Sequence, residues 1–144
     1  MKIIVSACLL GENCKYSGGN NYNEKVAEFI KGHAVIPVCP EVAGGLPVPR
    51  VPCEIVNGVV TGADGKSRNA EFRSGAEICL ETAIKEKVDL AILQPRSPSC
   101  GIGQIYDGTF SGKLIPGNGV FAQMLKERGI KVINAQELTE GTIK

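Results

Sequence analysis

The chain has 144 residues, of which 43% are hydrophobic and 22% are charged, and its formal net charge is +1 at pH 7. This length suits one ordinary domain with a buried core, so we expect a single domain over 1–144. The small, mixed charge gives no basis for binding a nucleic-acid polymer or an acidic membrane, and no apolar run approaches the length that crosses a bilayer. The apolar start of the chain lacks a separate cleavage region, so we expect a strand there and a cytoplasmic protein.

The first part of the chain predicts two short strands joined by a loop and a helix. A strand over 2–7 leads into a loop over 9–22 that is rich in glycine and asparagine. A helix is predicted to start near Asn23, which can cap it. A second buried strand follows over 34–38, and we expect it to be irregular or partly unpaired because Pro37 cannot donate to a sheet ladder.

The rest of the chain alternates helices and strands, with hairpins between them. Asn57-Gly58 stands between two pairs of β-branched residues, which favours a tight hairpin over 54–61. Apolar residues at helical spacing predict a helix up to residue 87. The elements expected after residue 38 are a loop over 40–52, the hairpin, a helix over 69–87, a strand over 89–93, a loop over 94–103, a hairpin over 106–115 turning near Ser111-Gly112, a helix from Gly117-Asn118-Gly119 to about Arg128, a strand over 131–134, and a short helix starting at Glu137 and Leu138.

Short apolar strands separated by helices are typical of an α/β domain. We therefore predict a single-domain, Rossmann-like open sheet that is mostly parallel, with helices on its faces and one or two β-hairpin insertions.

Three of the six cysteines follow predicted strands: Cys8, Cys39 and Cys100. The carboxyl ends of parallel strands share one edge, where ligands bind in open α/β sheets, so these thiols are expected to meet. Thiolates suit an iron–sulfur cluster or zinc, but a closed zinc site normally has a fourth ligand and often a local Cys-x-x-Cys pair, which this chain lacks. A cluster held by three cysteines leaves one iron open to act on a substrate. Each cysteine taken alone can equally be a small buried hydrophobic residue.

The other cysteines carry weaker expectations. Cys14 lies six residues after Cys8 in a polar loop and is open to three interpretations: a fourth ligand, a resolving thiol or a bystander. Cys53 is most simply a buried small residue. Cys79 lies on the apolar side of a predicted helix and is expected in the core.

Polar residues beside these cysteines are candidates for binding and catalysis. Glu41 lies two residues after Cys39, where a carboxyl group in a partly dry pocket can shuttle protons, or else can stabilise the loop. Ser97 and Ser99 stand just before Cys100 and can hydrogen-bond a substrate or a water molecule, or cap the turn.

Three further features are assigned less specifically. The backbone amides of Gly117, Asn118 and Gly119 at a helix start can bind an electron-rich group of the substrate, or can serve ordinary capping. Arg50 is an anion ligand or a surface charge. His33, at a junction between helix and strand, is expected to be structural.

Three motifs of the chain resemble those of the thiouracil desulfurase family. They are Ser-Ala-Cys-Leu-Leu-Gly (6–11), Cys-Pro-Glu with the following Gly-Gly-Leu-Pro and Pro-Arg (39–50), and Ser-Pro-Ser-Cys-Gly (97–101). The resemblance covers almost the whole chain, including Phe72 with Gly75-Ala76 and the Gly-Asn-Gly helix start. It implies a [4Fe–4S] cluster held by Cys8, Cys39 and Cys100, an acid/base role for Glu41 and an assisting role for Ser97.

The resemblance also implies the reaction. A thiolated pyrimidine base or nucleotide would be converted, without net redox change, to the oxygenated base and sulfide in a hydrolase-like step. Ser99, Gly117, Asn118 and Gly119 are the residues expected to bind this small-molecule substrate. The alternatives are a non-catalytic carrier of iron–sulfur, metal or sulfur, and a thiol redox protein, which the lack of a Cys-x-x-Cys motif disfavours. The oligomeric state is left open.

Overall fold

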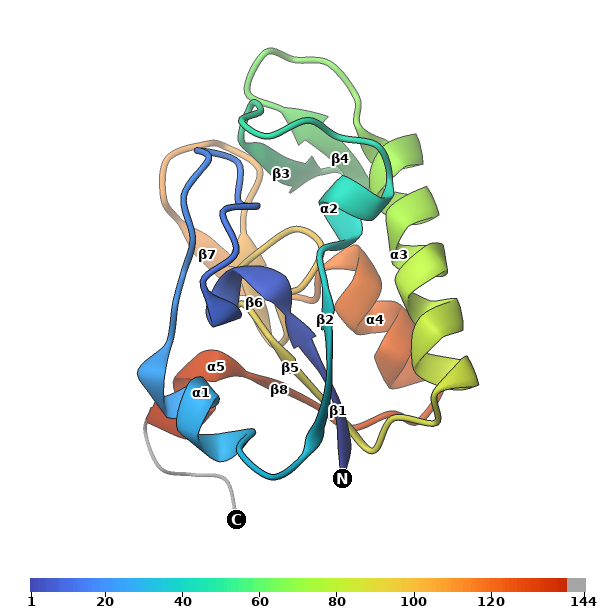
Figure 1. The fold of residues 1–144 in the computed structure, drawn as a ribbon. Helices are drawn as coiled ribbons and strands as arrows, with labels where there is room; N and C mark the ends of the chain where they lie inside the picture. Colours follow the sequence, from blue (N-terminus) through green and yellow to red (C-terminus); the bar gives the residue numbers. More distant parts are fainter. Residues whose placement is uncertain (140–144) are drawn as a thin grey trace.

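A four-stranded parallel sheet forms the centre of the protein in the computed structural model, which describes residues 1–139 (Figure 1). Its order is β2-β1-β5-β8, and every neighbouring pair runs parallel. The predicted α/β class with a mostly parallel sheet is therefore confirmed. The strands are β1 (Lys2–Ser6), β2 (Ala34–Val38), β5 (Leu90–Leu93) and β8 (Val132–Asn134).

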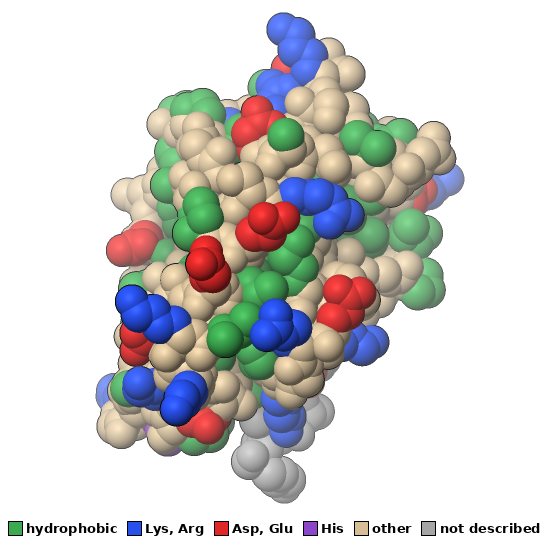
Figure 2. All heavy atoms as spheres, turned by 90° about the vertical axis from the view of Figure 1, so that its right-hand side faces the viewer, with side chains coloured by type: hydrophobic (Ala, Val, Ile, Leu, Met, Phe, Trp, Pro, Cys, Tyr) green, Lys and Arg blue, Asp and Glu red, His purple; other side chains and the backbone are tan. Residues whose placement is uncertain are grey.

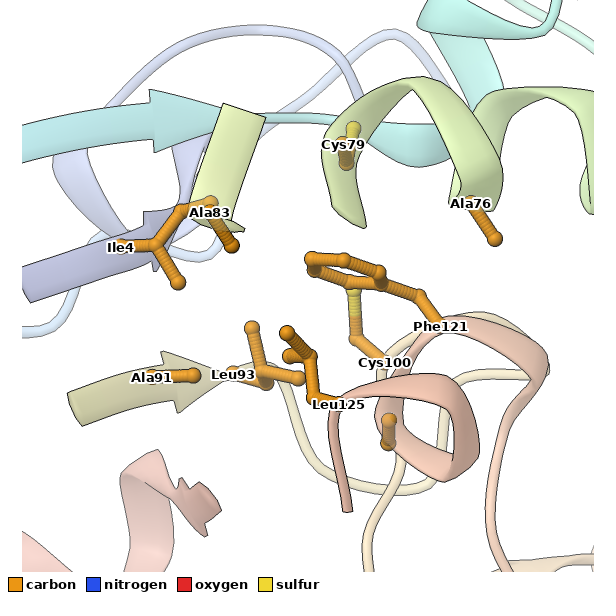
Figure 3. Packing of buried hydrophobic residues seen from close by; sticks show 10 residues of the cluster. Ile4, Ala76, Cys79, Ala83, Ala91, Leu93, Cys100, Phe121 and Leu125 are labelled. Carbon is orange, nitrogen blue, oxygen red and sulfur yellow. The ribbon is translucent and has the colours of Figure 1, made fainter. Parts of the chain in front are cut away.

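Helices cover both faces of this sheet (Figure 1). Successive side chains of a strand point to opposite faces, and those of β1 enter two separate hydrophobic clusters: Ile3 packs in one with Val26, and Ile4 packs in the other with Phe121 and Leu125. Figure 3 shows the second cluster, in which Cys79 and Cys100 are also buried, so the expected core position of Cys79 is confirmed. The helices are α1 (Glu24–Phe29) and α5 (Ala135–Thr139) on the first face, and α3 (Asn69–Lys85) and α4 (Val120–Glu127) on the second.

Two hairpins are inserted between the parallel strands. β3 (Cys53–Val56) and β4 (Val59–Gly62) pair antiparallel. Asn57 and Gly58 join them with φ angles of 50° and 79°, the left-handed conformation that a tight two-residue turn requires, as predicted. β6 (Gln104–Tyr106) and β7 (Leu114–Pro116) form a second antiparallel pair, so the expected hairpin is present but carries a wider loop that contains Ser111 and Gly112.

Local structure differs from the predictions at three places. β2 is only partly buried, because it is the edge strand of the sheet, a place where Pro37 is tolerated. The chain turns directly after β1 into a 3₁₀ helix, η1 (Ala7–Leu10). The expected loop after β2 begins with a short helix, α2 (Pro40–Ala43), which Pro40 favours because its fixed φ suits the first helical position. Asn23 caps α1 as expected, since its side chain accepts a hydrogen bond from the amide of Val26 (3.1 Å).

Acidic and basic side chains are interspersed over the face that carries α3 (Figure 2). Within residues 1–139, no helix has the length and apolar character needed to cross a membrane. His33 stacks on Phe29, with ring centroids 6.1 Å apart, in keeping with a structural role.

The backbones of α2 and α3 touch at two glycines. A methyl group on Gly75 would overlap the carbonyl oxygen of Pro40, and one on Gly44 would overlap the carbonyl oxygen of Glu71. This contact fixes α2, and with it the neighbouring Cys39 and Glu41, against the longest helix of the fold.

Gly75→Ala is therefore expected to lower the free energy of unfolding by about 1–3 kcal/mol, although alanine is the better helix former. The reason is that α2 has to move away from α3 to accommodate the methyl group. Urea denaturation of the metal-free protein measures the change. Ser74→Ala, at an exposed position of the same helix, is the control and should change stability by no more than about 0.5 kcal/mol. A Gly75→Ala protein as stable as wild type would contradict the close packing of the two helices.

Candidate active site

A cavity of about 620 Å³ lies beyond the carboxyl ends of β1, β2 and β5. The chain passes from β1 to its neighbour β2 on one side, whereas β5 pairs with β1 on the other side. The order of strands thus reverses at β1, and ligands in open α/β sheets bind at such a reversal. The buried side chain of Ser6 joins the two strand ends, because its hydroxyl oxygen accepts a hydrogen bond from the amide of Gln94 (3.0 Å).

The three cysteines predicted to meet all line this cavity. Cys8 lies in η1 directly after β1, and Cys39 is the residue that precedes the first turn of α2. Cys100 closes a turn after β5 in which the amide of Gly101 donates to the carbonyl oxygen of Ser97 (2.8 Å). The sheet therefore gathers thiols that are far apart in the sequence.

Each of these sulfur atoms has a polar neighbour. The amide nitrogen Nδ2 of Asn21 donates to Sγ of Cys8 (3.5 Å), and the hydroxyl of Ser99 lies 3.5 Å from Sγ of Cys100. The thiol of Cys39 lies 3.8 Å from the carbonyl oxygen of Cys14. Burial raises the pKa of the Cys8 and Cys100 thiols, and a bound metal group would lower it, because metals bind cysteine as the thiolate.

Two more thiols line the same cavity, those of Cys14 and Cys53. Burial, with a contribution from the neighbouring Cys39, raises the pKa of Cys14 to about 12, and burial raises the pKa of Cys53 to about 11. All six cysteines are free. Cys53 was predicted to be a simple buried residue. In the structure it is only half-buried and borders the cavity.

The thiols around the cavity match the usual protein ligands of an iron–sulfur cluster. Among residues 1–139, no three histidine, cysteine, aspartate or glutamate side chains are close enough together to hold one metal ion. Thiolates around one zinc ion would lie roughly 3.8 Å apart, given the usual zinc–sulfur bond length. An iron–sulfur cluster is larger than one ion, and its usual protein ligands are cysteines.

Glu41 lies in the first turn of α2 and also lines the cavity. Its Oε2 accepts a hydrogen bond from the hydroxyl of Ser99 (2.9 Å), and its Oε1 accepts two from Arg50. The carboxyl group therefore stands between a cation and a hydroxyl at the edge of the thiol-lined space. Arg50, whose side chain is 6% exposed, is a buried partner of Glu41 and not a surface charge.

The two serines of the Cys100 turn have different surroundings. Ser99 is 1% exposed and contacts Glu41 directly. The hydroxyl oxygen of Ser97 accepts hydrogen bonds from the amides of Ser99 (3.1 Å) and Cys100 (3.0 Å), and it lies 3.0 Å from the hydroxyl of Ser99. Ser97 thus caps the turn and orients Ser99, and both serines line the cavity.

Gly117, Asn118 and Gly119, which were predicted to bind the substrate, bond to the segment that follows Cys100. The amides of Gly117 and Gly119 donate to the carbonyl oxygens of Gly103 (3.2 Å) and Gly101 (2.7 Å), and Oδ1 of Asn118 accepts from the amide of Gly103 (2.9 Å). A methyl group on Gly119 would come within 2.5 Å of the backbone of Ser99. None of the three residues is among the described residues that line the cavity. They support the turn that carries Cys100, and their binding of a substrate stays a prediction.

The sequence did not single out several other residues of the cavity wall. Two of them, Arg96 and Phe110, have φ angles of 65° and 57°, a conformation that is uncommon for residues with side chains and is often found at functional sites. The loop positions alone give no indication that these segments fold over one space. The residues in question are Lys15, Tyr16, Arg96, Tyr106 and Phe110.

Comparison with known proteins identifies relatives of the chain. The chain matches the 2-thiouracil desulfurase family over residues 3–137. It is 38% identical over 148 residues to the uncharacterized protein YbbK of Bacillus subtilis (strain 168), over 96% of this chain and 98% of that protein. It is also similar to the solved structure of the [4Fe-4S]-dependent thiouracil desulfidase TudS, with a TM-score of 0.90 and 39% identity over 96% of this chain and 93% of that chain. The chain therefore belongs to the 2-thiouracil desulfurase family.

Proposed function

We propose that the protein is an iron–sulfur-dependent desulfurase that converts a thiolated pyrimidine to the oxygenated base and hydrogen sulfide. The observation that carries this proposal is that three strand-end thiols and a hydrogen-bonded carboxyl–hydroxyl pair, Glu41 with Ser99, open into one cavity. Family membership and the similarity to TudS support it.

Cys8, Cys39 and Cys100 would hold the [4Fe–4S] cluster, since they are the thiols at the three adjacent strand ends. With three protein ligands, the cluster would leave one iron open, which would supply a Lewis acid for a thiocarbonyl sulfur. Cys14 and Cys53 are not needed as ligands in this arrangement.

The residues of the chain manage the protons of the reaction. Water adds to the thiocarbonyl carbon and the carbon–sulfur bond breaks, so one thiocarbonyl and one water give one carbonyl and one hydrogen sulfide. Oε2 of Glu41 is placed to take a proton from the water and return it to the departing sulfur. Ser99 holds that oxygen in place, and Ser97 holds Ser99. No electrons enter or leave.

A carrier of iron–sulfur or sulfur would also use thiols around a cavity. It would not need a carboxyl group that is held between a buried guanidinium and a buried hydroxyl at the same place. This feature favours an enzyme over the carrier.

The proposal is tested by incubating the anaerobically reconstituted protein with 2-thiouracil and no added reductant. Uracil, measured by chromatography, and sulfide, measured colorimetrically, are expected to form in equal amounts over many turnovers. Metal-free protein is the control and should release neither. Failure to release sulfide, or release only with a reductant, would contradict a non-redox desulfurase.

A further inference from the structure

We infer that Arg50 is a positioning residue for the proposed reaction: it holds one oxygen of the Glu41 carboxylate so that the other is presented to Ser99 and the cavity. This inference rests on the proposed function. Arg50 is not among the described residues that line the cavity, so it would act on a substrate through residues that do, of which Glu41 is the first.

The contacts divide the two carboxylate oxygens between two tasks. Nε and Nη2 of Arg50 both donate to Oε1 of Glu41, at 3.1 and 2.9 Å. Oε2 accepts only from Ser99 among the described contacts, at 2.9 Å. Fixing one oxygen holds the plane of the carboxylate, so the other oxygen stays directed at Ser99 and the cavity.

The ion pair between Arg50 and Glu41 is largely buried. The side chains of Arg50 and Glu41 are 6% and 17% exposed, whereas those of Arg68 and Asp64, another pair in the fold, are 21% and 32% exposed. In a partly buried pair the geometry is held more firmly, and the loss of one partner costs more than at the surface.

Arg50 also ties the part of the cavity wall formed by Cys14 and Tyr16 to the same carboxylate. Nη2 donates to the carbonyl oxygen of Cys14 (2.9 Å), Nη1 donates to that of Pro47 (3.1 Å), and the backbone amide of Arg50 donates to that of Tyr16 (2.7 Å). Cys14 and Tyr16 both line the cavity. The guanidinium therefore sets the distance between this wall and Glu41. The planar fork of arginine makes these contacts together, which the single ammonium of lysine cannot do.

The decisive experiment is a double-mutant cycle between Arg50 and Glu41 with the reconstituted enzyme. Arg50→Met is expected to lower kcat for 2-thiouracil by about 100-fold, because a small misplacement of a catalytic group has an effect of this size. KM should change by less than about threefold, since Arg50 does not line the cavity. Arg50→Lys keeps the positive charge and tests the same role if Arg50→Met fails to fold. It should retain part of the activity, about a tenth of wild type. In a Glu41→Gln background, Arg50→Met should cause no further loss.

The control is Arg68→Met, which breaks the more exposed ion pair with Asp64 and should leave kcat within about twofold of wild type. Iron content is measured for every variant, and it should equal that of wild type. Losses that multiply in the double variant would show that Arg50 acts independently of Glu41 and would overturn the inference, as would a large loss of iron in Arg50→Lys.

A crystal structure of Arg50→Met separates this inference from the proposed function. It is expected to show the Glu41 carboxyl group turned away from Ser99, whereas Arg68→Met keeps their hydrogen bond. Glu41 still bonded to Ser99 in Arg50→Met would overturn the positioning role, whatever reaction the protein catalyses. Absence of desulfuration by the wild-type enzyme, with Glu41 displaced in Arg50→Met, would overturn the proposed function alone.

Discussion

Replacing Glu41 with glutamine is expected to leave the iron content of the reconstituted protein unchanged and to lower sulfide release from 2-thiouracil by about 100-fold or more. Glutamine has the same shape, and its amide oxygen can accept the hydrogen bonds from Arg50 while its amide nitrogen faces the hydroxyl oxygen of Ser99, but it cannot take up a proton. Initial rates of sulfide release at saturating substrate measure the effect, and visible absorbance shows that the cluster is retained.

Glu54 provides the comparison for this variant. Its carboxylate also borders the cavity, but Oε1 accepts hydrogen bonds from the amides of Gly108 (3.0 Å) and Phe110 (3.1 Å), so it orders a loop. Glu54→Gln should therefore lower the rate by less than about tenfold, chiefly through a higher KM. Equal losses of kcat in the two variants would contradict a specific proton-transfer role for Glu41.

Changing Cys8, Cys39 or Cys100 singly to serine is expected to remove most of the bound iron and to abolish sulfide release. A cluster with three protein ligands has none to spare, and a serine hydroxyl is a poor ligand for its iron. Iron per chain after anaerobic reconstitution and desalting measures the loss.

The other cysteines serve as internal controls for these variants. Cys79→Ala should keep its iron and its activity, because Cys79 lies in the hydrophobic core. Cys14→Ser tests the alternative of a fourth ligand: full iron content and activity are expected, and loss of iron would assign Cys14 to the cluster. Retention of iron in Cys8→Ser, Cys39→Ser and Cys100→Ser alike would contradict the assigned ligand set.

Much of the fold follows from local patterns in the sequence. Short apolar runs separated by amphipathic ones predict the parallel sheet and its helices, and Asn57-Gly58 predicts the turn between β3 and β4. These features depend on residues that are close in sequence. The family was also identified correctly from its motifs. The prediction of one domain over 1–144 includes residues 140–144, which lie outside the described part of the chain.

The sequence predicted only those residues of the candidate site whose positions follow from the direction of the strands. Residues that directly follow parallel strands must lie at one edge, which is why Cys8, Cys39 and Cys100 could be grouped. The pairing of Arg50 with Glu41 depends on how the loop after α2 folds back, and no periodicity records that. Two alternatives were left open for Arg50, and the buried ion pair is a third.

The Gly-Asn-Gly segment shows the limit of interpreting a motif without its surroundings. A helix start after glycines exposes amides, but the carbonyl groups of the Cys100 turn take them up. The close approach that glycine permits is to the backbone of Ser99 and not to a ligand. The Gly-Asn-Gly segment affects the site indirectly, because it holds the turn that carries Ser97, Ser99 and Cys100.

The most direct measurement is the content of iron and acid-labile sulfide in the wild-type protein after anaerobic reconstitution and removal of unbound metal. About four iron and four sulfide per chain are expected for a [4Fe–4S] cluster gathered by the strand ends. A colourless protein that binds one zinc per chain, and takes up no iron in its place, would contradict a cluster in this cavity.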